Sequence, residues 1–369
     1  MDVMPKWAEV VLVPLISLLL AAVISALVIL AIGEDPIEAT KLMVDGAIGS
    51  VRGWGYTLYY ATNFIFTGLA VAVAFHARLF NIGGEGQAML GGLGVALVLL
   101  YIPWPHWSIG LIAATMAAAA FGALWALIPA YLQAKRGSHI VITTIMFNFI
   151  ASALLIYVLN EFLKPVGQAD PSSARFADHL DLPTLNSVLN GLGIKASKDD
   201  SVNVTFLISL LCAFAVWVLM WRTRLGYEIR AFGHSESAAK YAGINPVKIT
   251  IVAMVISGGL AGLMAINTVM GESEKLILNS TEGAGFIGIA VALMGRSHPA
   301  GVVIAAILFG FLYQGGAELA LWTSIPRELI VVIQALVILF TGALDNMVRM
   351  PLESAFLALR RRPKSGPAE

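Results

Sequence analysis

The sequence predicts an all-α polytopic membrane protein with about ten transmembrane helices, because long apolar runs recur along its whole length. Of its 369 residues, 58% are hydrophobic and 12% are charged, whereas roughly a quarter of the residues in soluble domains are charged. The mean hydropathy of +0.82 agrees with this class. We expect one transmembrane domain over residues 1–345, embedded in the lipid bilayer, and a cytoplasmic tail over residues 346–369.

Each candidate span is an apolar run close to the roughly 20 residues that cross the hydrocarbon core. The first run is too long for the core of a signal peptide, so we expect it to remain as a membrane helix. The run 283–295 is short, and 36–48 has the pattern of an amphipathic surface helix. The candidate spans are 10–32, 56–75, 85–102, 108–132, 140–162, 204–221, 248–270, 283–295, 299–317 and 326–344.

The distribution of Lys and Arg predicts that both ends of the chain face the cytoplasm. With the N-terminus inside, 15 of the 23 Lys and Arg residues fall in cytoplasmic segments and 8 on the other side. Cytoplasmic loops of membrane proteins are enriched in these residues. Half of the eight lie in a long outer loop, 164–203, where the rule has little weight.

A polar joint, residues 81–87 (Asn-Ile-Gly-Gly-Glu-Gly-Gln), separates the second and third runs. Glu85 is the one carboxylate between Arg52 and Glu161, and an acid among membrane spans usually faces a cavity or a partner. Glycine-rich backbone at membrane depth is tolerated where it is buried in protein or lines a cavity. The alternative is a tight cytoplasmic turn in which Glu85 and Gln87 cap a helix N-terminus. Glu85 could cap a helix N-terminus and border a cavity at the same time.

The candidate residues of a translocation path come from this joint and from one amide elsewhere. Asn148 lies in the middle of an apolar run, where it could bond across helices or contact a polar solute. We favour the interhelical bond slightly, but the position keeps Asn148 among the candidates. The path residues that we propose are Asn81, Gly83, Gly84, Glu85, Gln87 and Asn148.

A short repeat relates two of the spans. Residues 67–72 (Thr-Gly-Leu-Ala-Val-Ala) resemble residues 287–292 (Ile-Gly-Ile-Ala-Val-Ala), and both copies would run from outside to inside as a parallel repeat. Chance similarity is the alternative. Residues 283–288 also match Gly-x-Gly-x-x-Gly, but no strand precedes them and no acid follows at the spacing of a dinucleotide site. Close helix packing by small residues explains both this segment and 258–262 better.

The sequence has no signature of an enzyme, a metal centre or a cofactor site. Walker A, His-Glu-x-x-His and Gly-x-Ser-x-Gly motifs are absent, and Cys212 is the one cysteine. A formal net charge of zero supplies no field that would recruit nucleic acid. The cores of the spans hold almost none of the ionisable groups that ion-coupled carriers use. We therefore expect no catalysis and no cofactor, and we expect a partner protein to supply the energy.

The most polar cytoplasmic loop, 222–247, predicts a short docking helix. Ser235 can cap a helix that runs to about Ala242, and Gly243 can end it. Its face carries Ala238, Ala239, Tyr241 and Ala242. A short helix with small residues, held between two spans, suits a groove of a cytoplasmic protein. The alternative is a connector that lies on the membrane.

Together these segments resemble the permease subunits of bacterial ATP-binding cassette importers. They look most like the branch that includes simple-sugar, ribose-type and purine-nucleoside permeases, which is related to the branched-chain amino acid permeases. The resemblance covers residues 56–345 and rests on the segments 67–72, 79–87, 141–148 and 230–244. The joint sequence is typical of the nucleoside-like and simple-sugar-like group. Ser138 and His139 depart from the family, which often has Asn-Glu there.

The resemblance implies a multi-pass permease of the bacterial inner membrane that imports a nucleoside or a simple sugar. It also implies three kinds of partner: cytoplasmic ATP-binding subunits, a second permease subunit as a homodimer or a related heterodimer, and an extracytoplasmic solute-binding protein. The alternative function is a stand-alone secondary carrier or channel for small polar solutes. By the same resemblance the coupling residues are Arg230, Ala231, Gly233, Ser235, Ala238, Ala239, Tyr241 and Gly243.

Overall fold

The computed structural model describes residue 5, residues 12–184, residue 187, residues 202–323, residue 325 and short stretches between 331 and 357. The chain divides into two compact units, which we describe separately. The first unit comprises Met1–Val44 and Gly315–Glu369, and the second comprises Asp45–Gln314. The predicted span 326–344, the tail 346–369 and most of the outer loop beyond residue 184 lie outside the described residues or only partly within them.

The first unit contains α1 (Val13–Ile32) and most of α2 (Pro36–Ile48). Gly33 ends α1 with a φ of 95°, and its N–H donates to the carbonyl of Leu30 over 3.0 Å. Glycine adopts this left-handed conformation without a steric penalty. Asp35 then accepts a hydrogen bond of 2.8 Å from the Ile37 N–H at the start of α2. The helix expected over residues 36–48 is confirmed.

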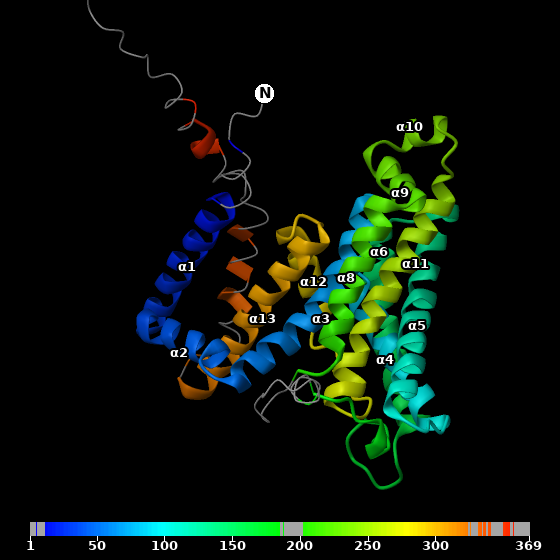
Figure 1. Ribbon diagram of the computed structural model, residues 1–369, viewed down its shortest axis with the longest axis horizontal. Helices are drawn as coiled ribbons and strands as arrows, with labels where there is room; N and C mark the ends of the chain where they lie inside the picture. The colour runs from blue at the N-terminus through cyan, green and yellow to red at the C-terminus, as the bar shows by residue number, and fades with distance from the viewer. Residues whose placement is uncertain are drawn as a thin grey trace, which may run out of the picture. The chain divides into compact units, whose positions relative to one another are not determined.

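The second unit is a bundle of long helices with short helices at one end. In Figure 1, α9 and α10 lie together beyond the upper ends of α8 and α11. Two π-helical segments, Leu159–Leu163 and Ile266–Glu272, continue α6 and α11. The helices are α3 (Val51–His76), α4 (Gly84–Tyr101), α5 (Trp107–Arg136), α6 (Ile140–Val158), α8 (Thr205–Arg222), α9 (Arg224–His234), α10 (Glu236–Tyr241), α11 (Pro246–Ala265), α12 (Ala284–Met294) and α13 (Pro299–Trp322, which ends in the first unit).

Eight of the described helices are long and apolar enough to cross a membrane. They correspond to eight of the ten predicted spans. The run 283–295 forms α12, which has only 11 residues. The run 326–344 falls among residues that are only partly described. The polytopic all-α class is therefore confirmed.

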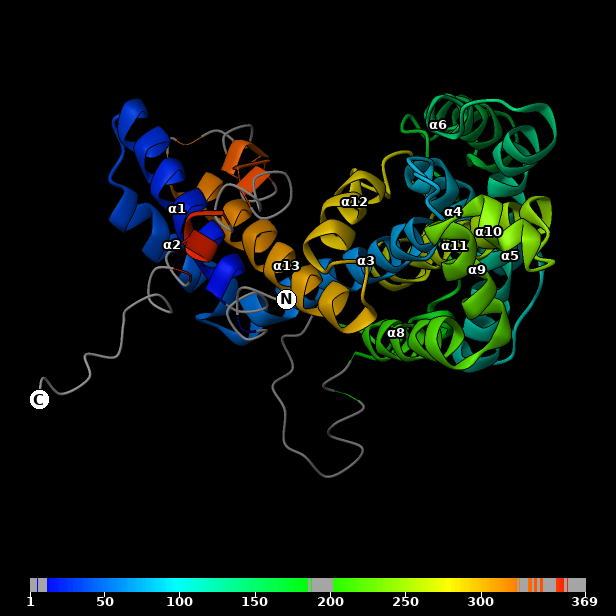
Figure 2. The ribbon, with the colours of Figure 1, turned by 90° about the horizontal axis from the view of Figure 1, so that it is seen from above.

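Close contacts between small residues join α4, α5 and α11, which lie side by side in Figure 2. A methyl group added to Gly262 would overlap the Ala118 carbonyl and would lie 3.2 Å from the Gly122 Cα. A methyl group on Gly91 would meet the Gly262 backbone in the same way. Glycine therefore lets these backbones touch, which confirms the packing expected for residues 258–262.

The two copies of the short repeat pack against each other. A methyl group on Gly288 would meet Thr67, and one on Gly68 would lie 2.9 Å from a Val291 methyl carbon. Farther along, the His76 Nε2 and the Ser297 carbonyl oxygen are 3.0 Å apart. Since residue numbers rise together along α3 and α12, the two copies run in parallel.

Candidate functional site

The joint 81–87 lies inside the bundle and not at its end. After α3 stops at His76, the chain turns at Arg78, whose φ is 56°, and α4 begins at Gly84. The Asn81 Nδ2 donates to the Ser257 Oγ over 2.9 Å. Ser257 lies about 16 Å along α11 from its first residue, at about 1.5 Å per residue. The chain therefore turns back into the bundle before α4 starts.

Paired amides hold the first half of the joint. The Asn81 Nδ2 donates to the Gln87 Oε1 over 2.9 Å, and the Gln87 Nε2 donates to the Asn81 Oδ1 over 3.1 Å. The Gly83 N–H also donates to the Asn81 Oδ1. Ser257 in turn donates to the Ala70 carbonyl over 2.7 Å, so the pair is tied to α11 and through it to α3. Asn81 and Gln87 are each 1% exposed, and these hydrogen bonds offset the free-energy cost of burying their amide groups.

Helix α6 supports the joint from a second side. The Asn148 Oδ1 accepts from the Gly86 N–H, and its Nδ2 donates to the Ile82 carbonyl, both over 2.9 Å. The Thr144 hydroxyl accepts from the Ile82 N–H over 3.3 Å. Both polar groups of Asn148 are thus used between helices, which is the interaction that we favoured from the sequence.

Glu85 connects the start of α4 to the start of α12. Its side chain is 5% exposed. The Oε1 atom accepts from the Thr281 hydroxyl over 2.5 Å and from the Gly283 N–H over 3.0 Å. The Oε2 atom accepts from the Gly285 N–H over 2.8 Å. A carboxylate also stabilises the positive end of a helix dipole. Glu85 therefore caps a helix N-terminus, but the helix is α12, which is remote in sequence.

The helix starts meet through glycine. A methyl group on Gly285 would overlap the backbone N–H of Glu85, and one on Gly84 would lie 3.4 Å from the Gly285 carbonyl oxygen. The six candidate path residues taken from the sequence are thus all buried at or beside the joint: Asn81, Gly83, Gly84, Glu85, Gln87 and Asn148.

A small cavity of about 30 Å³ lies next to this cluster and shares Thr281 with it. Aromatic rings form one wall: Tyr313 lies 5.0 Å from the ring centre of Tyr60 and 5.5 Å from that of Phe64. Asn63, Thr268, Glu272 and Ser280 add polar groups. Sequence reasoning missed this cavity, although the aromatic residues of segment 56–66 were a usable signal.

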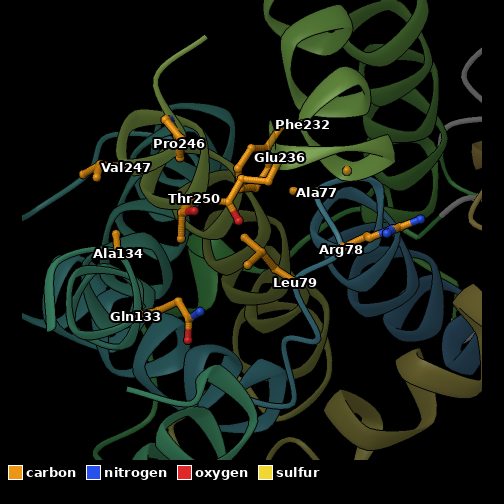
Figure 3. Close-up of a pocket in the computed structure, with 11 residues that line it drawn as sticks. Ala77, Arg78, Leu79, Gln133, Ala134, Phe232, Glu236, Pro246, Val247 and Thr250 are labelled. Carbon is orange, nitrogen blue, oxygen red and sulfur yellow. The ribbon is translucent and has the colours of Figure 1, made fainter. Parts of the chain in front are cut away.

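A larger cavity of about 330 Å³ lies at the end of the unit that carries α9 and α10 (Figure 3). The α3–α4 connection contributes Leu79 to its lining, α5 contributes Gln133, and the start of α11 contributes Thr250. Phe232 of α9 and Glu236 of α10 close another side. The cavity therefore lies between the polar loop 222–247 and the chain that leads into the joint.

The polar loop contains two capped helices. The Ser235 hydroxyl accepts from the Ala238 N–H over 3.3 Å at the start of α10, as the sequence predicted. Gly243 follows α10 with a φ of 81°. The preceding helix, α9, was not predicted; the Thr223 hydroxyl caps it by accepting from the Gly226 N–H over 3.1 Å.

The predicted coupling residues divide into buried and exposed groups. Gly233 packs against the His76 carbonyl so closely that a methyl group would overlap it, and Ala239 is 2% exposed. The Arg230 guanidinium lies 5.9 Å from the centre of the Trp221 ring. Tyr241, in contrast, is 96% exposed. Ala231 is half-buried, as is Ser235, whereas Ala238 and Gly243 are exposed. The buried residues attach the loop to the bundle, and the exposed residues present a surface.

Residues 54–342 match the family described as the branched-chain amino acid transport system permease component. The chain belongs to this family. It is 34% identical to the guanosine ABC transporter permease protein NupP of Bacillus subtilis, over 92% of this chain and 95% of NupP. It is 32% identical to a glucose ABC transporter permease protein of Haloferax volcanii, over 96% and 92% of the two chains. NupQ, a second guanosine ABC transporter permease protein of B. subtilis, is 27% identical over 73% of this chain and 84% of NupQ.

The permease is thus a multi-pass cell-membrane component of an ATP-binding cassette importer, and it is not itself an enzyme. This confirms the resemblance drawn from segments 67–72, 79–87, 141–148 and 230–244. It also decides against the alternative of a stand-alone carrier or channel. A transporter of this class includes ATP-binding subunits, which supply the energy source that the permease lacks.

Proposed function

We propose that the permease imports an uncharged solute rich in hydroxyl groups, a nucleoside or a simple sugar. The observation that carries this proposal is a cavity lined by the aromatic rings Tyr60, Phe64 and Tyr313 together with amide, hydroxyl and carboxylate groups. Rings stack on nucleobases and on the apolar faces of sugars, and the polar groups suit hydroxyls. The names of the guanosine and glucose relatives support the same two solute classes.

The aromatic cavity must widen when the solute binds. Its volume of about 30 Å³ is the share of one water molecule in the liquid, which is far below the size of a nucleoside. The loop 273–283 and the start of α12 form part of its wall. We propose that this wall moves, and that the joint residues Asn81, Gly83, Gly84, Glu85, Gln87 and Asn148 border the route that it opens.

The exposed face of the polar loop is the proposed contact with the ATP-binding subunits. Tyr241 supplies a large exposed side chain of the kind that dominates protein interfaces, and Ala238 and Gly243 lie near it in the chain. The buried residues of the loop, Gly233 and Ala239, keep this face attached to the bundle.

The second permease subunit is proposed to be a related chain and not another copy. Two guanosine permease proteins of one organism, NupP and NupQ, are both similar to this chain, at 34% and 27% identity. A homodimer is the alternative. An extracytoplasmic solute-binding protein is proposed to deliver the solute from the other side of the membrane.

Uptake into reconstituted vesicles tests the solute proposal. The permease with its partner subunits is expected to accumulate radiolabelled guanosine or glucose when ATP is present, and to continue when an uncoupler collapses the proton gradient. Tyr313→Leu, which removes a ring from the cavity wall, is expected to reduce this uptake. Uptake that is absent for both solutes, or that stops with the uncoupler alone, would reject the proposal.

A further inference from the structure

We propose that the 330 Å³ cavity behind α9 and α10 is a second binding site for the transported solute, occupied on the cytoplasmic side before release. This rests on the proposed function. The volume falls within the roughly 300–1,000 Å³ of small-molecule pockets, whereas the aromatic cavity has a volume of only about 30 Å³. The site takes an uncharged molecule with several hydroxyl groups.

The chemistry of the lining favours a neutral solute. Arg78 is exposed, and its side chain points away from the middle of the cavity in Figure 3. Glu236 points inward, and its carboxylate forms an ion pair of 2.9 Å with the exposed Lys240. Thr250 is 5% exposed and offers a hydroxyl. Arg78 and Glu236 carry opposite charges, so the lining has no net formal charge.

Gln133 lines the cavity, and its side chain carries an unmet hydrogen-bonding atom that is buried beside it. Its Oε1 atom is buried and has no hydrogen-bond partner among the described residues. A buried acceptor without a partner costs free energy, and such an atom in a folded protein calls for an explanation. A rotation of the amide toward a hydroxyl of a bound solute would supply the missing bond.

The cavity lies beside both the joint 81–87 and the polar loop 222–247. Leu79, on its wall, precedes the buried Asn81 of the joint by two residues, and Thr281, on the other side of the joint, lines the aromatic cavity. Phe232 and Gly233 of α9 also line it. A movement of α9 would therefore change the shape of the site directly.

Cysteine protection tests the site. Because Cys212 is the one cysteine, Cys212→Ala gives a permease without thiols, and labelling is read on the permease band alone. Ala134→Cys and Thr250→Cys each place a thiol in the cavity lining, and Lys135→Cys, exposed and next in sequence, is the matched control. Inside-out vesicles that contain the whole complex are labelled with a maleimide, with and without guanosine or glucose.

We expect labelling at either lining position to slow about tenfold at a solute concentration of about ten times Kd, since the bound fraction is shielded. Labelling of Lys135→Cys should not change. Equal rates with and without solute at both lining positions, in vesicles from cells that take up the solute, would overturn the second site. Protection without uptake would instead support the site and reject the transport proposal, so the two failures can be told apart.

Discussion

Replacing Glu85 by glutamine tests whether one side chain holds the starts of α4 and α12 together. The variant keeps the shape of the side chain but places an NH₂ group where an oxygen now accepts. In either amide orientation, one of the two backbone donors, Gly283 or Gly285, then faces another donor. The two remaining bonds lose the strength that the negative charge gives them.

The size of the effect follows from these contacts. A lost hydrogen bond to a charged group costs about 1.5–3 kcal/mol, and the loss of a charge at a helix N-terminus adds about 0.3–2 kcal/mol. We therefore expect the first turn of α12 to be destabilised by about 2–5 kcal/mol. A loss of about 2 kcal/mol would raise local opening about 30-fold, at about 1.4 kcal/mol per factor of ten.

Hydrogen exchange of the peptide that covers residues 281–290, measured by mass spectrometry on the complex in nanodiscs, reports this opening. Thr281→Val removes one donor and should have a smaller effect of the same kind. Glu161→Gln changes an exposed carboxylate and is the control that should leave the exchange unaltered. If Glu85→Gln leaves the exchange of this peptide unchanged, the cap at α12 does not stabilise the structure. If Glu85 also borders the path, uptake should fall more in Glu85→Gln than in Thr281→Val.

Three further predictions concern the packing, the docking face and the energy source. Gly262→Ala should destabilise the permease by about 1–3 kcal/mol through overlap with Ala118, whereas Gly259→Ala, whose methyl group finds ordinary contacts, should not. Thermal unfolding in detergent compares the two variants, and equal melting temperatures would contradict the packing argument. Tyr241→Ala should weaken co-purification of the ATP-binding subunits while Ser237→Ala does not, and full retention would show that this face is not the contact. The permease alone should hydrolyse no ATP in nanodiscs, because it has no phosphate-binding loop, and turnover by the isolated chain would refute this.

Local sequence patterns were enough to predict most of the helices. Hydropathy located the spans, and Ser235 and Gly243 marked the bounds of α10, because capping and burial depend on residues close together in the chain. The sequence also identified the joint as unusual, since a carboxylate and three glycines lie there between two apolar runs.

The partners of the joint could not be predicted in the same way. Glu85 bonds to Thr281, and Asn81 bonds to Ser257, across nearly two hundred residues of sequence. No periodicity or spacing encodes such pairs, because they depend on which helices pack together. For the same reason the depth of the joint and the aromatic cavity, which combines α3 with α13, emerged only from the structure.

The shared carboxylate determines which parts of the permease can move independently. A helix of 11 residues whose first turn is bonded to Glu85 cannot shift far from α4 without breaking three hydrogen bonds. Gly283, with a φ of 77°, precedes α12 and Gly295 follows it, so the backbone can rotate at both ends of this helix. The starts of α4 and α12 are therefore joined by one side chain, and a transport cycle that separates them must first displace it.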